Sequence, residues 1–170
     1  MKIGKRTRRG AIPRKPNKRR IKPPLRMQYA ALPYRLTLLA GLEVLLVTTR
    51  RSKRWIIPKG WPIKGLAPSR SAAREAFEEA GVRGKIGTKS VGVFTYDKLL
   101  DQHALPVNCE VKVFPLLVKR QSEVWPEMEQ RLFQWFEQSE AVSLIREPQL
   151  KKLVAKFANR IAATARKQAR

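Results

Sequence analysis

Residues 60–82 read GWPIKGLAPSRSAAREAFEEAGV, a loop rich in glycine and proline followed by a run that predicts a helix. Glu75, Glu78 and Glu79 are spaced i, i+3 and i+4, so on a helix they share one face. At about 100° per residue, that face points away from the apolar side, and we expect it to be exposed. Carboxylates this close repel one another, and a hard divalent cation, which prefers oxygen ligands, would relieve the repulsion. The segment therefore predicts a metal site.

The same segment resembles the Nudix box, the signature of Nudix hydrolases, which is Gly, five residues, Glu, seven residues, then Arg-Glu-apolar-any-Glu-Glu-any-Gly-apolar. The matching residues are Gly60, Arg74, Glu75, Glu78, Glu79, Gly81 and Val82. Leu66 stands where the motif has its first Glu, which in the family supports the loop and helix, partly by pairing with the Arg. The resemblance implies a site for Mg²⁺ or Mn²⁺, with ligands from the Gly60 carbonyl and from Glu75, Glu78 and Glu79.

Charge divides the chain into three parts. The 170 residues carry 37 Lys and Arg against 13 Asp and Glu, a net charge of +24. Residues 1–26 hold twelve basic residues, four prolines and no acidic residue, and residues 151–170 hold seven basic residues and no acidic one. We therefore expect a flexible basic extension over 1–28, a folded domain over 29–150 and a basic helix or tail over 151–170. The resemblance implies that the domain over 29–150 is a Nudix hydrolase domain.

Composition also limits the class of protein. No apolar run reaches membrane-spanning length, and the N-terminal residues have no apolar core of a secretory signal. The single cysteine, Cys109, excludes an intramolecular disulfide and is expected to be a small buried residue. These features favour a cytoplasmic protein. The basic ends could contact RNA or another polyanion without sequence preference, or could simply keep the chain soluble.

The pattern of apolar residues predicts an α/β fold. We expect strands over 36–40, 42–49, 55–57, 91–96, 107–118 and 132–136, and helices over 69–80, 139–145 and 148–163. Ser69 is expected to cap the first helix and Gly81 to end it. Over about residues 30–146 the chain resembles the diadenosine and diphosphoinositol polyphosphate branch of the family, as in RWIIPKGWPIKG and EVWPEMEQRLFQWF. That resemblance implies an α/β/α sandwich around a mixed sheet.

Several basic and aromatic residues are candidates for binding substrate. Lys59 and Lys64 flank the Gly-rich turn, where they could grip phosphate oxygens. Arg54 ends a second basic cluster, residues 50–54, which could also bind phosphate or could simply keep the chain soluble. Trp61 could stack on a base or rim the pocket. Arg74 could hold the glutamates in place, or could be an ordinary i,i+4 partner of Glu78.

The residue that takes the proton of the attacking water has several candidates. One is a carboxylate of the cluster that is not committed to metal. Others are Glu127 and Glu129, which precede the last predicted strand, with Glu110 less favoured. His103 is the only histidine, and a lone histidine in a loop is more often incidental than catalytic.

These features together predict a metal-dependent pyrophosphohydrolase acting on a polyphosphorylated small molecule. Dinucleoside or nucleoside polyphosphates are the first expectation, and diphosphoinositol polyphosphates the second. One alternative is removal of pyrophosphate from the 5′ end of RNA, which the basic ends favour. Another is a non-catalytic Nudix-fold module that binds nucleic acid, although such a module would not need three clustered carboxylates.

Overall fold

Two long parallel strands form the centre of the molecule. The computed structural model describes residues 25–38, 41–98 and 106–168, and in that part of the chain eight strands form one mixed sheet. Strands β1 (Arg26–Thr37) and β7 (Val107–Gln121) pair in parallel over nine residues each. Parallel strands far apart in sequence need a crossover connection, and the intervening residues of the chain supply it.

The other strands extend this pair antiparallel to their neighbours. Strands β2 and β4 pair with β1, β3 and β8 pair with β2, and β5 and β6 pair with successive parts of β7. Their bounds are β2 Gly41–Thr48, β3 Trp55–Ile56, β4 Lys59–Gly60, β5 Val82–Ile86, β6 Gly92–Lys98 and β8 Phe133–Glu137.

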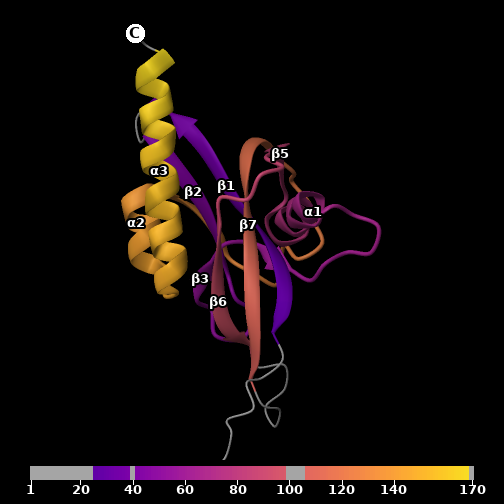
Figure 1. Cartoon of the computed structure of the whole chain (residues 1–170). Helices are drawn as coiled ribbons and strands as arrows, with labels where there is room; N and C mark the ends of the chain where they lie inside the picture. The colour runs from indigo at the N-terminus through magenta and orange to yellow at the C-terminus, as the bar shows by residue number, and fades with distance from the viewer. Residues whose placement is uncertain (1–24, 39–40, 99–105, 169–170) are drawn as a thin grey trace, which may run out of the picture.

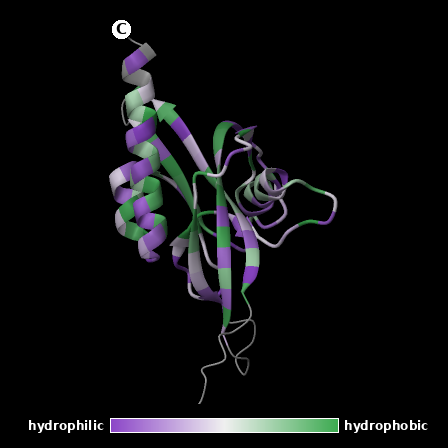
Figure 2. Ribbon diagram, viewed as in Figure 1, coloured by the Kyte–Doolittle hydropathy of each residue, from purple (hydrophilic) through white to green (hydrophobic). Residues whose placement is uncertain are grey.

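Helices cover both faces of the sheet. Helix α1 (Pro68–Ala80) lies on one face, and α2 (Gln138–Leu144) and α3 (Pro148–Gln168) lie on the other (Figure 1). The long central strands and the helices both carry hydrophobic and hydrophilic residues (Figure 2), as expected for elements with one face on a core. The predicted α/β/α sandwich with a mixed sheet is therefore confirmed.

The ends of α1 explain how the carboxylate helix is placed. Pro68 occupies the first helical position and Ala67 the N-cap, so the expected cap at Ser69 was wrong. Gly81 ends the helix as expected, with φ +69°, and its N–H donates to the Phe77 carbonyl over 2.8 Å. A Cβ on Gly81 would lie 2.5 Å from the Trp125 ring, so glycine also permits the close packing of that ring.

The sheet and α3 are longer than the sequence pattern predicted. Strand β1 begins at Arg26 because its backbone pairs with β7, and α3 runs to Gln168, with Leu150, Val154 and Phe157 buried against the sheet. The boundaries expected after residues 28 and 150 therefore fall inside β1 and α3. Strands β4 and β5 lie where no strand was expected. In the described residues, no helix is long and apolar enough to cross a membrane.

Candidate functional site

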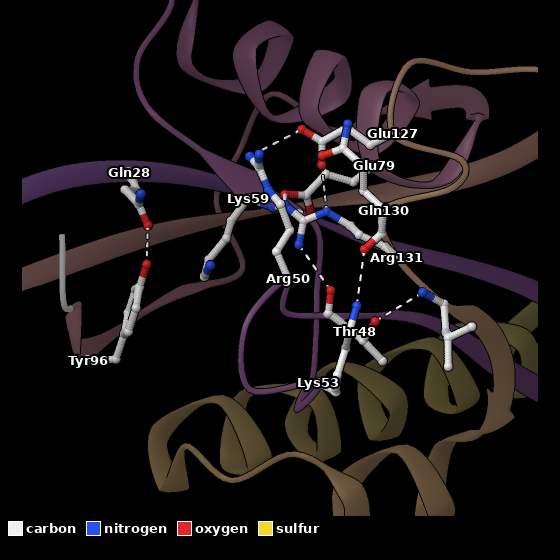
Figure 3. Close-up of polar contacts among 11 residues, drawn as sticks. Gln28, Thr48, Arg50, Lys53, Lys59, Glu79, Tyr96, Glu127, Gln130 and Arg131 are labelled. Atoms are coloured by element: carbon white, nitrogen blue, oxygen red, sulfur yellow. Dashed lines mark hydrogen bonds and ion pairs between the residues drawn. The ribbon is translucent and has the colours of Figure 1, made fainter. Parts of the chain in front are cut away.

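Glu79 is buried, so the expectation that all three carboxylates lie on an exposed face was wrong. It is 4% exposed and lies beside fully buried Ala76 and Ala80 on α1. One carboxylate oxygen lies 2.5 Å from the Arg131 guanidinium, and the other accepts the Lys59 backbone N–H over 3.3 Å (Figure 3). Burial raises the pKa of Glu79 to about 7, and the opposing charges of Arg131 and Lys59 do not offset it. The charges of Arg131 and Lys59 therefore only partly offset the cost of burying the ionised Glu79 carboxylate.

Arg131 is the main partner of the carboxylate helix, and sequence reasoning did not identify it. Its side chain is 9% exposed. Besides Glu79 it donates to Glu127 over 2.6 Å and to the Thr48 carbonyl over 3.0 Å. A guanidinium with this many partners is held in one orientation.

The segment between β7 and β8 brings Arg131 to this position. Its backbone donates twice to the C-terminal end of α1, from Ser122 to the Gly81 carbonyl and from Glu127 to the Glu78 carbonyl, each over 2.9 Å. Leu132 then exchanges bonds with Thr48 of β2. The segment is thus fastened to both layers that adjoin the site.

Glu75 lies against the backbone of Gly60. A Cβ built on Gly60 would lie 2.1 Å from the Glu75 carboxyl carbon, so only glycine leaves room for that carboxylate. Burial raises the pKa of Glu75, and the negative charges of Glu78 and Glu127 raise it further. Oxygen atoms with mutually repelling charges therefore gather beside the Gly60 main chain.

Glu78 pairs with Arg74, its i,i+4 neighbour on α1, over 2.5 Å. This pair was one of the two expectations for Arg74. The Arg74 side chain is 60% exposed, and Leu66, at the family's usual Glu position, is also exposed. With Glu78 turned to Arg74 and Glu79 to Arg131, no three acidic, histidine or cysteine side chains in residues 25–38, 41–98 and 106–168 are arranged to hold one metal ion. The expected convergence of three carboxylates is not present in this arrangement.

Lys59 lies next to the carboxylates and carries an unneutralised charge. Its ammonium is 4.9 Å from the centre of the Tyr96 ring, and within the described residues no carboxylate lies at ion-pair distance from it. Burial lowers the pKa of Lys59, although the charge of Glu79 opposes this. A largely desolvated ammonium without an anion is suited to an anionic ligand.

The other predicted substrate residues have different surroundings. Lys98 lies 4.7 Å from the Trp61 ring, so a cation already covers a face of that ring. Arg54 pairs with Glu147 over 3.5 Å and donates to Ser52 over 3.0 Å. Lys64 is exposed in the loop before α1, and no contact within the described residues joins it to Lys59.

The candidates for the proton acceptor are not equivalent. Glu127 receives Arg131 on one oxygen and lies 3.3 Å from Arg50 through the other, so both oxygens are occupied by cations (Figure 3). Glu129 is exposed, and Glu110 is half-buried in β7. His103 and the basic residues 1–24 lie outside the described residues.

Comparison with known proteins gives a consistent family assignment. The NUDIX domain model matches residues 36–157. Nudix hydrolase 21, chloroplastic, of Arabidopsis thaliana is 34% identical over 139 residues, which cover 79% of this chain and 67% of that protein. Diphosphoinositol polyphosphate phosphohydrolase 3-alpha of Homo sapiens is 35% identical over 106 residues, 61% of this chain and 60% of that protein.

Solved structures agree in fold. The crystal structure of the C. elegans Ap4A hydrolase has a TM-score of 0.57 at 20% identity, covering 81% of this chain and 98% of that one. The NUDIX domain of Shewanella oneidensis NrtR, complexed with ADP ribose, has a TM-score of 0.61 at 12% identity, covering 86% and 94%. Against four further plant relatives, the chain spans 46% to 62% of their length.

Proposed function

Because the chain belongs to the Nudix hydrolase family, we propose that it is a metal-dependent pyrophosphohydrolase that cleaves a phosphoanhydride in a polyphosphorylated small molecule. One observation carries this proposal. Three features meet at the two-residue strand β4: the Glu75 carboxylate against Gly60, the buried Glu79, and the unpaired Lys59 ammonium. Acidic oxygens for a cation thus lie on one side of β4, and an ammonium for phosphate lies on the other.

The charges and the oxygen chemistry of this site favour a divalent metal ion, which Nudix hydrolases generally need, once Glu78 turns from Arg74. Burial and the charges of Glu78 and Glu127 raise the pKa of Glu75, and burial of Glu79 outweighs the arginine that faces it. Added positive charge would therefore stabilise the ionised form of both carboxylates. We propose the Gly60 carbonyl, Glu75, Glu78 and Glu79 as ligands of Mg²⁺, with Mn²⁺ as the second choice. Such an ion neutralises phosphate oxygens and makes a water molecule more acidic.

The protein's own groups have separate tasks in this proposal. Lys59 binds a phosphate oxygen with its ammonium, which regains an anionic partner when substrate arrives. Arg131 fixes the orientation of Glu79 and Glu127, so that substrate does not have to order them. Arg74 releases Glu78 at small cost, since an exposed ion pair contributes at most about 1 kcal/mol.

For the substrate we propose a dinucleoside or nucleoside polyphosphate first and a diphosphoinositol polyphosphate second. Two matched proteins have names that fit these two substrate classes, a diphosphoinositol polyphosphate phosphohydrolase by sequence and an Ap4A hydrolase by fold. Hydrolysis at the 5′ end of RNA is retained as the alternative because of the net charge of +24. We propose the cytoplasm as the compartment, although several matched plant proteins are named chloroplastic or mitochondrial.

The experiment is a release assay for phosphate and pyrophosphate, with Mg²⁺, with Mn²⁺ and with chelator. The substrates are dinucleoside polyphosphates, diphosphoinositol polyphosphates and triphosphorylated RNA. Glu75→Gln should reduce turnover at least about 100-fold, because it removes a proposed ligand. Glu140→Gln, an exposed glutamate on α2, should have no effect. Full activity in chelator, or in Glu75→Gln, would refute the metal-dependent mechanism.

A further inference from the structure

Among the residues that the structure describes, two deeply buried side-chain atoms on the α3 side of the sheet have no hydrogen-bond partner. They are Nε2 of Gln28, on a residue 1% exposed in β1, and Oε2 of Glu147, on a residue 8% exposed just before α3. A buried polar atom without a partner costs roughly 1–3 kcal/mol. One atom is a donor and the other an acceptor, so a single ligand group could satisfy both.

Strand register places the Gln28 side chain beside Lys59. Lys59 pairs with Ala30, two residues from Gln28, so both side chains lie on the same face of the sheet. The Tyr96 hydroxyl donates to Gln28 over 2.7 Å, and the Lys59 ammonium lies over the Tyr96 ring (Figure 3). The charge of Glu147 acts on the pKa of both Lys59 and Tyr96. Gln149, two residues after Glu147, accepts the backbone N–H of Thr95, the neighbour of Tyr96, so the start of α3 adjoins the Tyr96–Gln28 pair and the two atoms belong to one neighbourhood.

Both side chains are held in place by their other atoms. Gln28 accepts the Tyr96 hydroxyl through Oε1, which fixes its amide and leaves Nε2 free. Glu147 uses Oε1 for Arg54 and leaves Oε2 free. Gln149, two residues later, accepts the Thr95 backbone N–H over 2.7 Å and fastens the start of α3 to β6. The two free atoms are thus preorganised on rigid elements.

The proposed metal-binding carboxylates of α1 lie on the opposite side of β4 from Gln28 and the Lys59 side chain. The Cβ direction of Gly60 points at Glu75 of α1, whereas the preceding residue, Lys59, faces the α3 side. A polyphosphate bound at Gly60 and Lys59 would cross this short strand. Its organic end would then reach the neighbourhood of Gln28 and Glu147.

We propose that Gln28 and Glu147 form a specificity subsite that binds the organic part of the substrate, through a neutral group presenting a hydrogen-bond donor beside an acceptor. This inference rests on the proposed function. The donor of the ligand bonds Glu147, the acceptor bonds Gln28, and Lys59 binds the adjoining phosphate. The edge of a nucleobase has this chemistry, and so have the hydroxyls of a polyol. Arg54 acts as a positioning residue because it orients Glu147.

The test compares two near-isosteric variants with matched controls. Glu147→Gln removes the charged acceptor, and Gln28→Glu removes the donor while keeping the oxygen that accepts Tyr96. Glu140→Gln and Gln134→Glu make the same changes at exposed positions on α2 and β8. The measured quantity is kcat/KM for diadenosine tetraphosphate and for diphosphoinositol pentakisphosphate, each divided by kcat/KM for inorganic tripolyphosphate. Thermal unfolding checks that each variant folds.

Each subsite variant should lower this ratio about 10- to 100-fold for the substrate whose organic group occupies the subsite. Glu147→Gln loses a hydrogen bond to a charged carboxylate, and Gln28→Glu sets an acceptor against the acceptor of the ligand. A loss with the dinucleotide identifies a nucleobase, and a loss with the inositol compound identifies a polyol. Ratios within about twofold of wild type for both substrates, as expected if buried water satisfies both atoms, overturn the subsite.

Absence of turnover would count against the proposed function and would leave the subsite to be tested by binding. If the wild-type protein turns over none of the three compounds, the same ratios are taken from dissociation constants measured by calorimetry in chelator. A loss of affinity for an organic compound in Glu147→Gln and Gln28→Glu then supports the subsite without hydrolysis. Unchanged affinity ratios overturn it.

Discussion

Replacing Gly60 by Ala should remove activity while leaving the fold nearly as stable as wild type. The new methyl group would lie 2.1 Å from the Glu75 carboxyl carbon. Non-bonded carbons stay about 3.5–4 Å apart, so the carboxylate must move by about 1.5 Å. Displacement of a reacting group by about 1 Å can cost about 100-fold in rate. We therefore expect turnover to fall about 100-fold.

Stability should respond differently, because the displaced atoms are the far end of a flexible side chain. An unfavourable rotamer at Glu75 costs about 1 kcal/mol, and the loss of glycine's freedom in the unfolded chain returns about 0.4–1 kcal/mol. The free energy of unfolding of Gly60→Ala should therefore stay within about 1 kcal/mol of wild type.

Gly65→Ala is the matched control, and we expect it to lose stability while keeping its activity. Gly65 has φ +81° and open space around its Cα, so alanine meets no atom but takes a left-handed conformation that costs about 1–2 kcal/mol. Its melting temperature should fall by about 2–8 °C, at 2–4 °C per kcal/mol for a chain of this size, with turnover near wild type. Steady-state kinetics and differential scanning calorimetry measure both quantities. Wild-type turnover in Gly60→Ala would refute the proposed role of the Glu75–Gly60 contact.

Three further substitutions test the charges of the site. Lys59→Met should raise the melting temperature, because burial lowers the pKa of Lys59, and should cut kcat/KM for polyphosphates at least about tenfold. The stability gain should narrow as the pH rises through the lowered pKa of Lys59, because wild type then loses the buried charge, and a variant less stable than wild type at pH 7 would contradict this. Leu66→Glu should be tolerated and stabilise by up to about 1 kcal/mol by pairing with Arg74, whereas a large rise in activity would show that the position is not structural. Burial raises the pKa of Glu79 to about 7, so in chelator wild type should lose stability as the pH rises from about 4.5 through 7. Glu79→Gln should flatten that dependence in thermal melts, and an unchanged pH profile would show that Glu79 does not titrate there.

Sequence patterns predicted most of the elements, because helix and strand periodicity is a local property. Helix α1 and strands β2, β3, β6, β7 and β8 lie close to their expected positions. Strand β5 was missed because Val82–Ile86 contains Gly84 between two basic residues and is a strand only through pairing with β7. The early start of β1 was missed for a related reason, since Arg26 and Met27 are exposed and only the backbone of β7 makes them strand.

The sequence by itself determined the family motif, the carboxylate helix and the loop glycine beside it, because these depend on residues within one turn or loop of each other. Tertiary structure alone decided which way the carboxylates face and what they meet. Arg131 reaches Glu79 only because the segment before β8 is fastened to the end of α1. Likewise Gln28 and Glu147 come from opposite ends of the domain and share a neighbourhood only through β6 and β4. No local pattern encodes such pairs, since burial and electrostatic partnership depend on the packing of distant segments.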